Sequence, residues 1–311
     1  MNPAYSVIFF TTASGAGYGL LALTAFAASS HGPASSLGFA LACIVLSLVL
    51  ITAGLLSSTA HLGRPERAWR AFSQWRSSWL SREGIVAVVT YPVALAFGLV
   101  WSGLVDMPAL IRPLGLLTAA MCALTVFCTA MIYRQLTTIP AWANRFAVPG
   151  YLLFGLATGA GLLSLLSVVF GRFQAGAGPF QVVLTMILIV AVMALKWFYW
   201  RWLEMRPTQF TMAEATGLGD GVRQWEVPHT ARNFIMKEMG FQVARAHAQR
   251  LQRICLLLLA VALVSMLASL LLPWSVAIAA ITLLLAAWTE RWLFFAQAEH
   301  VSALYYGKTE I

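Results

Sequence analysis

The sequence predicts an all-α integral membrane protein, a bundle of eight transmembrane helices. Two observations carry this prediction: 60% of the 311 residues are hydrophobic, and only 10% are charged, against roughly 25% in soluble domains. The mean hydropathy of +0.79 agrees. So few charges cannot cover the surface of a soluble chain of this size, so a soluble enzyme, a disordered chain and a secreted disulfide scaffold are excluded. The net charge of +9 is therefore interpreted as a signal of membrane orientation, not of nucleic-acid binding.

Eight segments have the length of a transmembrane helix, which needs about 20 mostly apolar residues. They leave a polar loop over 61–84 and a long extramembrane loop over 201–253, and together they form one domain over 1–311. No basic segment precedes the first apolar stretch, so no cleaved signal peptide is expected. The expected spans are 6–29, 37–60, 85–105, 113–133, 148–170, 180–200, 254–272 and 274–295.

Glycines recur at short spacing inside the first and fifth spans. Gly15, Gly17 and Gly19 resemble part of a dinucleotide-binding fingerprint, but no strand precedes them. Gly155 and Gly159 have the spacing that lets transmembrane helices approach closely. We therefore interpret both sets as helix-packing positions.

The distribution of basic residues predicts the orientation. Eight spans place both termini on one side, and that side carries 18 of the 20 Lys and Arg residues. The two exceptions are Arg112 and Arg172. Because basic residues are enriched in cytoplasmic segments, we expect both termini and the 61–84 loop to face the cytoplasm.

No redox metal centre is expected in this chain. Its four cysteines lie in or beside apolar spans and form no Cys-x-x-Cys pair, and no span has an interior histidine. Iron–sulfur clusters and haem need such ligands. We therefore expect no haem, no iron–sulfur cluster and no molybdenum here. The cysteines are Cys43, Cys122, Cys128 and Cys255.

Ionisable residues gather at the cytoplasmic ends of the spans and are scarce near the membrane midplane. Ion and proton transporters place such groups near the midplane, so this distribution favours an apolar bundle with its chemistry at one rim. The residues concerned are His61, Glu83, Arg134, Lys196, Glu290 and Arg291.

The rim between the second and third spans has the residues that a lipid-soluble quinone requires. His61 ends the second span and offers a hydrogen-bond donor to a quinone carbonyl. Glu83 begins the third span and can relay protons to the ring. The loop between them is rich in Arg and Trp, and aromatic side chains can hold the ring. The candidate quinone-binding residues are His61, Glu83, Arg64, Arg67, Trp69 and Trp79, and Glu83 is the only one with an expected catalytic role.

Residue patterns alone leave this rim open to simpler interpretations. A histidine at a helix C-terminus interacts favourably with the helix dipole. The arginines fit membrane anchors and the tryptophans fit an interfacial belt. A transport site, or a secondary transporter with inverted repeats and broken helices, is a further alternative, although neither feature is evident in the sequence.

The motif His61-Leu-Gly-Arg-Pro-Glu-Arg-Ala, followed by Trp79-Leu-Ser-Arg-Glu83, resembles the DMSO reductase anchor subunit family. That family has His-Leu-Gly-x-Pro-x-Arg-Ala before a Ser-x-Glu at similar spacing. Three further segments look like the branch that anchors quinone-linked sulfite dehydrogenase of the cytoplasmic type. They are Ala215-Thr-Gly-Leu-Gly with Pro228-His-Thr, Met236-Lys-Glu-Met-Gly-Phe, and Glu290-Arg-Trp-Leu-Phe-Phe-Ala.

The resemblance implies an anchor in the bacterial inner membrane that binds quinone or quinol, either ubiquinone or menaquinone. It implies two partner subunits: an iron–sulfur subunit with four clusters and a molybdenum bis-pterin catalytic subunit. Membrane lipid is the remaining expected partner, and no nucleic-acid partner is expected. The motif histidine and the nearby acid correspond to His61 and Glu83. A cytoplasmic motif favours sulfite oxidation over the outward-facing arrangement of enteric DMSO reductases, which remain the alternative.

The long loop over 201–253 is expected to contain a short amphipathic helix. Within 233–253, Ile235, Met239, Val243 and Ala246 recur at three- and four-residue steps, with basic residues mostly elsewhere. That pattern favours a helix lying at the membrane interface. It would serve either as a docking platform for the iron–sulfur subunit or as a basic lipid-binding helix.

Overall fold

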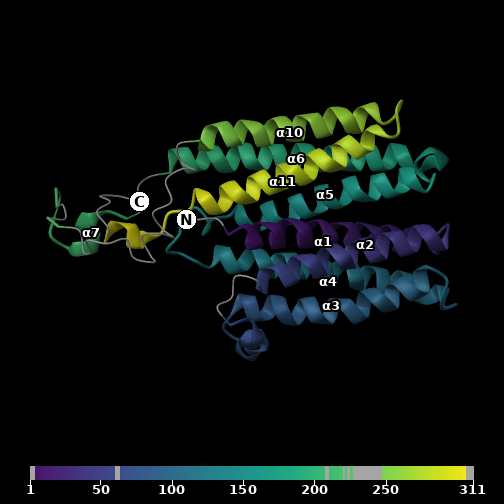
Figure 1. The fold of residues 1–311 in the computed structure, drawn as a ribbon, viewed down its shortest axis with the longest axis horizontal. Helices are drawn as coiled ribbons and strands as arrows, with labels where there is room; N and C mark the ends of the chain where they lie inside the picture. The colour runs from purple at the N-terminus through teal and green to yellow at the C-terminus, as the bar shows by residue number, and fades with distance from the viewer. Residues whose placement is uncertain are drawn as a thin grey trace.

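The structure is a computed structural model that describes residues 4–59, 64–206, 210–219, 221–222, 225–226 and 247–305. Within this part, eight helices are long and apolar enough to cross a membrane. Figure 1 shows them packed along one long axis, which confirms the predicted helical membrane fold. They are α1 (Tyr5–His31), α2 (Leu37–Thr59), α3 (Trp79–Trp101), α4 (Ile111–Arg134), α5 (Ala147–Val169), α6 (Gly178–Met205), α10 (Ala248–Ala268) and α11 (Ser275–Ala296).

Three helices have an end that lies four or more residues from the end of the apolar segment expected from the sequence. Helix α3 begins at Trp79 and not at position 85, α6 continues to Met205, and α10 runs from Ala248 to Ala268. An apolar segment is interrupted by the first charged residue, but a helix continues through charged residues whose long side chains reach water or a partner. The change in α3 matters most, because it places Glu83 inside the helix and not at its start.

Helix α1 lies inside the bundle and contacts α2, α4 and α5 along its length. Glycines make this approach possible. A Cβ atom on Gly19 would lie 1.8 Å from the carbonyl oxygen of Gly155, and one on Gly159 would lie 2.2 Å from the carbonyl carbon of Gly19. On Gly17 it would lie 2.7 Å from the oxygen of Ser47 in α2. The interpretation as packing positions is confirmed for Gly17, Gly19, Gly155 and Gly159, whereas a Cβ atom on Gly15 would meet nothing within 4 Å.

Short helical turns lie outside the eight long helices. At the end of the bundle where α1 begins and α11 ends lie η1 (Pro65–Gln74), α7 (Met212–Thr216) and η4 (Val301–Leu304). We call this the terminal end; Figure 1 shows α7 projecting beyond it. At the opposite end lie η2 (Pro108–Leu110) and η3 (Phe173–Ala177). Most of the predicted amphipathic helix, including Ile235 to Ala246, lies outside the described residues.

We expect Gly19→Ala to destabilise the bundle by about 3 kcal/mol, the upper part of the usual overpacking cost, because the new methyl group meets the backbone of α5. Gly15→Ala is the matched control, since a Cβ there meets nothing within 4 Å. It should leave stability unchanged or raise it by up to about 1 kcal/mol. Thermal unfolding of the purified chain in detergent measures both. Equal losses from the two variants would contradict glycine-mediated packing of α1 against α5.

Candidate functional site

The first turn of α3 is fixed to the loop before it by hydrogen bonds. The Ser78 hydroxyl caps α3 by accepting from the backbone N–H of Ser81 at 3.4 Å. Arg82 donates from Nε to the carbonyl oxygen of Trp75 at 2.9 Å and from its terminal nitrogen to that of Arg76 at 2.7 Å. These contacts hold the end of the Arg- and Trp-rich loop against the helix that carries Glu83.

Glu83 is a buried carboxyl group in the second turn of α3, only 4% exposed. The Thr129 hydroxyl of α4 donates a hydrogen bond to Glu83 Oε1. In the part of the chain that the structure describes, Glu83 forms no ion pair. Burying an unpaired charge is costly. A carboxyl group with no counter-cation can take up and release a proton without breaking an ion pair.

Three buried tyrosines lie on α4 and on two helices that pack against it, α1 and α5. They are Tyr18 of α1, Tyr133 of α4 and Tyr151 of α5. The rings of Tyr133 and Tyr151 stack with centroids 5.7 Å apart. Glu83 therefore lies in the contact between α3 and α4, below the rim that the sequence suggested.

The other predicted quinone-binding residues divide into two groups. Trp79 is half-buried, four residues before Glu83 on α3, with its ring 5.7 Å from that of Phe127 and 4.4 Å from the Arg82 guanidinium. Residues four apart share a helix face, so Trp79 and Glu83 lie on one side of α3. Arg64, Arg67 and Trp69 instead lie exposed on the loop. His61 lies outside the described residues.

The exposed group has only weak contacts in the described chain. Trp69 is 66% exposed and has the Arg70 guanidinium 5.6 Å from its ring. Arg67 lies 4.0 Å from the exposed carboxylate of Glu66. Exposed ion pairs of this kind contribute little to stability. These side chains are therefore available to a ligand or a partner surface.

A second buried ionic group lies on the other side of the bundle. Lys196 of α6 forms an ion pair with Glu290 of α11, and Arg291 lies 3.1 Å from the other oxygen of the same carboxylate. All three side chains are at most 4% exposed. We call Lys196, Glu290 and Arg291 the ionic triad. It contains two cations and one anion, an arrangement that is rare inside a membrane protein.

The ionic triad connects α6 and α11 to α5. The Arg291 guanidinium lies 3.5 Å from the ring centroid of Tyr151 and 3.5 Å from the carbonyl oxygen of Gly150. Lys196 lies 4.5 Å from the ring of Tyr199, whose hydroxyl donates to the carbonyl oxygen of Ala141 at 3.0 Å. Aromatic faces supply the partial negative charge that the surplus cation needs.

The sequence alone places Lys196, Glu290 and Arg291 at the ends of spans and assigns them no joint role. The structure buries them because α6 continues nine residues beyond Lys196 and α11 continues six beyond Glu290. The sequence does contain a signal for this ion pair. Lys196 and Glu290 have opposite charges and lie at a similar depth in two spans that end on the same side. Thr129, the partner of Glu83, has no signal of its own, because a threonine in an apolar span is common.

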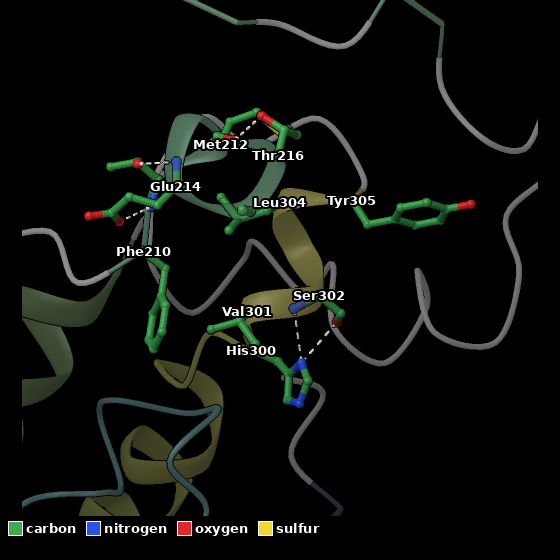
Figure 2. Close-up of a pocket in the computed structure, with 11 residues that line it drawn as sticks. Phe210, Met212, Glu214, Thr216, His300, Val301, Ser302, Leu304 and Tyr305 are labelled. Atoms are coloured by element: carbon green, nitrogen blue, oxygen red, sulfur yellow. Dashed lines mark hydrogen bonds between the residues drawn. The ribbon is translucent and has the colours of Figure 1, made fainter. Parts of the chain in front are cut away.

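Two cavities in the described part of the chain lie away from Glu83, which lines neither of them. One, of about 560 Å³, lies beyond the terminal end between α7 and η4 (Figure 2). A capping box between Thr211 and Glu214 builds α7, and His300 Nδ1 accepts from the backbone N–H of Ser302 at 3.0 Å. Partial burial lowers the pKa of His300 below its usual value. The second cavity, of about 430 Å³, lies between α6 and α10.

We expect Glu290→Gln to destabilise the bundle by about 3–5 kcal/mol, because it leaves two buried cations without an anion. Lys196→Met should cost less, because it leaves Glu290 and Arg291 as a one-to-one pair. Thermal unfolding of the purified variants in detergent measures the order. A larger loss of stability in Lys196→Met than in Glu290→Gln would contradict the conclusion that Glu290 is the single anion between two cations.

Comparison with known proteins agrees with this architecture. The family model for the DMSO reductase anchor subunit (DmsC) matches residues 1–297. The chain is also 34% identical over 331 aligned positions to a sulfite dehydrogenase subunit of Allochromatium vinosum, an alignment that covers 98% of this chain and 99% of that protein. The match spans all eight long helices, including the end of α2 and the start of α3 where the motif residues lie. The chain therefore belongs to the DMSO reductase anchor subunit family.

Proposed function

We propose that this chain is the membrane anchor and quinone-reactive subunit of a sulfite-oxidising molybdenum enzyme. The observation that carries the proposal is Glu83, a buried carboxyl group at the terminal end of the bundle with no cation partner among the described residues. The similarity to a sulfite dehydrogenase subunit supports the choice of complex. The chain would pass electrons between an iron–sulfur partner and the membrane quinone pool.

The residues around Glu83 suit the proton chemistry of a quinone. A quinone takes up two electrons and two protons on reduction, so its site needs a group that can deliver protons from water to the membrane interior. Glu83 can do so because, within the described chain, it is held only by the Thr129 hydroxyl. Glu290 is less suited, since two cations fix its charge. Trp79 offers an aromatic face on the same side of α3, and His61 would donate to a quinone carbonyl.

The distribution of charge supports a cytoplasmic terminal end. In the proposed orientation, 18 of 20 basic residues face the cytoplasm and only Arg112 and Arg172 face outward. The host membrane would be the bacterial inner membrane. The iron–sulfur subunit would sit on the terminal end, above Glu83, and carry the molybdenum bis-pterin subunit. The exposed Arg64, Arg67 and Trp69 would then face that partner or the quinone.

Two alternatives remain distinguishable by experiment. An anchor for a DMSO reductase, or for a related S- or N-oxide reductase, fits the family equally well and would oxidise menaquinol. Sulfite is preferred because a relative that aligns over 99% of its own length is a sulfite dehydrogenase subunit. If the chain is instead a secondary transporter, it should move a solute across the membrane without any partner subunit. Purification with bound subunits, followed by assays with sulfite and with an S-oxide, separates all three.

The proposed orientation predicts which engineered cysteines react with a membrane-impermeant thiol reagent in intact cells. Trp75→Cys lies on the exposed loop at the terminal end and should not react, whereas Gln174→Cys at the opposite end should react. The four native cysteines are buried, so their background labelling should be low. Labelling of position 75, with position 174 protected, would reverse the orientation and favour the outward-facing DMSO reductase arrangement.

The proposed quinone site predicts selective loss of quinone-linked activity. Glu83→Gln cannot carry a proton, and we expect quinone-linked sulfite oxidation to fall roughly 100-fold, the lower end of a positioned acid–base contribution. His61→Ala should weaken quinone binding roughly 5- to 150-fold, from the loss of a hydrogen bond worth about 1–3 kcal/mol. Activity with a water-soluble dye should persist in both variants, because electrons can leave from the partner's clusters.

Glu66→Gln is the matched control, since it removes a carboxylate from the exposed loop near the same helix and should change neither activity. The deciding measurement is the ratio of quinone-linked to dye-linked activity in assembled complexes. A parallel fall of both activities with loss of assembly would make Glu83 and His61 structural. An unchanged ratio would place the quinone elsewhere, and the loop around Trp225 and His229 would be tested next.

A further inference from the structure

The groove between α6 and α10 is built from two facing helix surfaces. Helix α6 contributes Trp197, Trp200, Arg201 and Glu204 to the cavity of about 430 Å³. These positions are spaced by three, one and three residues, so they form one face of the helix. Seven residues along a helix span about 10 Å. The groove is therefore long enough to hold a phosphate with its glycerol.

The opposite wall repeats this spacing on α10. It consists of Gln249, Gln252, Arg253 and Leu256. Helix α6 ends at the terminal end and α10 begins there, so the two helices run in opposite directions. Their deepest groove residues are accordingly apolar, Trp197 and Leu256. The charged and amide side chains lie toward the terminal end, and the groove changes from apolar to polar along its length.

The charges of the groove have no partners within the described chain. Arg201 and Arg253 are exposed, and neither forms an ion pair or hydrogen bond with a described residue. Glu204 is also exposed and has no ion-pair partner among the described residues. The groove therefore has a surplus of one positive charge at the depth where the membrane ends, which favours an anion.

The apolar surface below the groove continues along the same two faces. Val190 lies seven residues below Trp197 on α6, and Leu263 lies seven residues beyond Leu256 on α10. Val190 is exposed and Leu263 is half-buried. Trp197 is 55% exposed, whereas Trp200 is buried against the core. A ligand in the groove would thus meet polar groups at one end and a membrane-facing apolar track at the other.

We infer that this groove binds an anionic phospholipid. The phosphate lies between Arg201 and Arg253, since guanidinium groups recognise phosphate with charge-assisted hydrogen bonds, and basic pockets between helices bind anionic headgroups. Gln249 and Gln252 hydrogen-bond the glycerol headgroup. Trp197 lies at the ester region, where tryptophan is favoured. The acyl chains follow Val190 and Leu263 into the membrane. This site lies on α6 and α10, separate from Glu83 on α3.

The test is a lipid titration of the purified full chain in detergent, followed by native mass spectrometry. We expect dioleoyl phosphatidylglycerol to bind in preference to dioleoyl phosphatidylcholine. Each basic residue near an anionic lipid contributes roughly fivefold in affinity, so R201Q/R253Q should weaken phosphatidylglycerol binding about 25-fold. Removal of the repelling carboxylate in E204Q should strengthen it about fivefold. R134Q removes an exposed arginine from α4 at the same end and should change nothing.

Each contrary result overturns the proposal. If R134Q weakens binding as much as R201Q/R253Q, the attraction is a diffuse surface effect. If inorganic phosphate competes with the lipid at equal concentration, the occupant is free phosphate. If neither R201Q/R253Q nor E204Q changes the affinity, the groove binds no anion. Thermal unfolding in phosphatidylcholine-containing detergent, unchanged in all three variants, excludes misfolding as the cause.

Discussion

Direct backbone contact between α1 and α5 is the constraint on which the rest of the bundle depends. Gly19 and Gly159 bring the two helices so close that no side chain fits between them. Apolar lipid tails provide no hydrophobic drive for helix association, so such packing must supply much of the stability. Because α1 and α5 meet here, Tyr151 of α5 is held against Arg291 of the ionic triad. One close contact thus positions an aromatic ring beside the ionic triad.

The two buried glutamates have opposite environments, and this difference favours a structural role for Glu290 and a chemical role for Glu83. Glu290 lies between Lys196 and Arg291, so its charge is permanently compensated and it links α6 with α11. Glu83 has the Thr129 hydroxyl, and nothing in the described chain fixes its charge. A membrane protein keeps an uncompensated carboxyl group at a cost. That cost is understandable where a proton must move, which favours Glu83 over Glu290 as the proton carrier of the proposed quinone reaction.

The sequence predicts the number and type of helices well, because an apolar run of about 20 residues has few other possible structures. It predicts helix ends less well. Residues 79–84 include the consecutive polar residues Ser81, Arg82 and Glu83, which interrupt the apolar run. The Ser78 cap and the bonds of Arg82 to the loop nevertheless make this segment the first turns of α3. The pairing of Lys196 with Glu290 depends on how α6 and α11 are rotated about their axes, which hydropathy does not report. The sequence makes Glu83 a candidate because it begins the third span at the same rim as His61. Its contact with Thr129 depends on the packing of α3 against α4.

The arrangement of the sites across the bundle would let the protein contact a partner subunit, a quinone and an anionic lipid at the same time. Helices α3 and α4, with Glu83, lie on one side of the α1–α5 contact, and α6 and α10, with the lipid groove, lie on the other (Figure 1). Both sites nevertheless lie toward the terminal end, which carries most of the basic residues. A partner subunit seated over Glu83 would leave the outer surface of α6 and α10 in contact with lipid. An anionic lipid there would neutralise Arg201 and Arg253 without competing for the quinone, and it would hold the far edge of the bundle at a fixed depth in the membrane. The depth of Glu83 relative to the membrane surface, and with it the length of its proton path, would then be set from the opposite side of the protein.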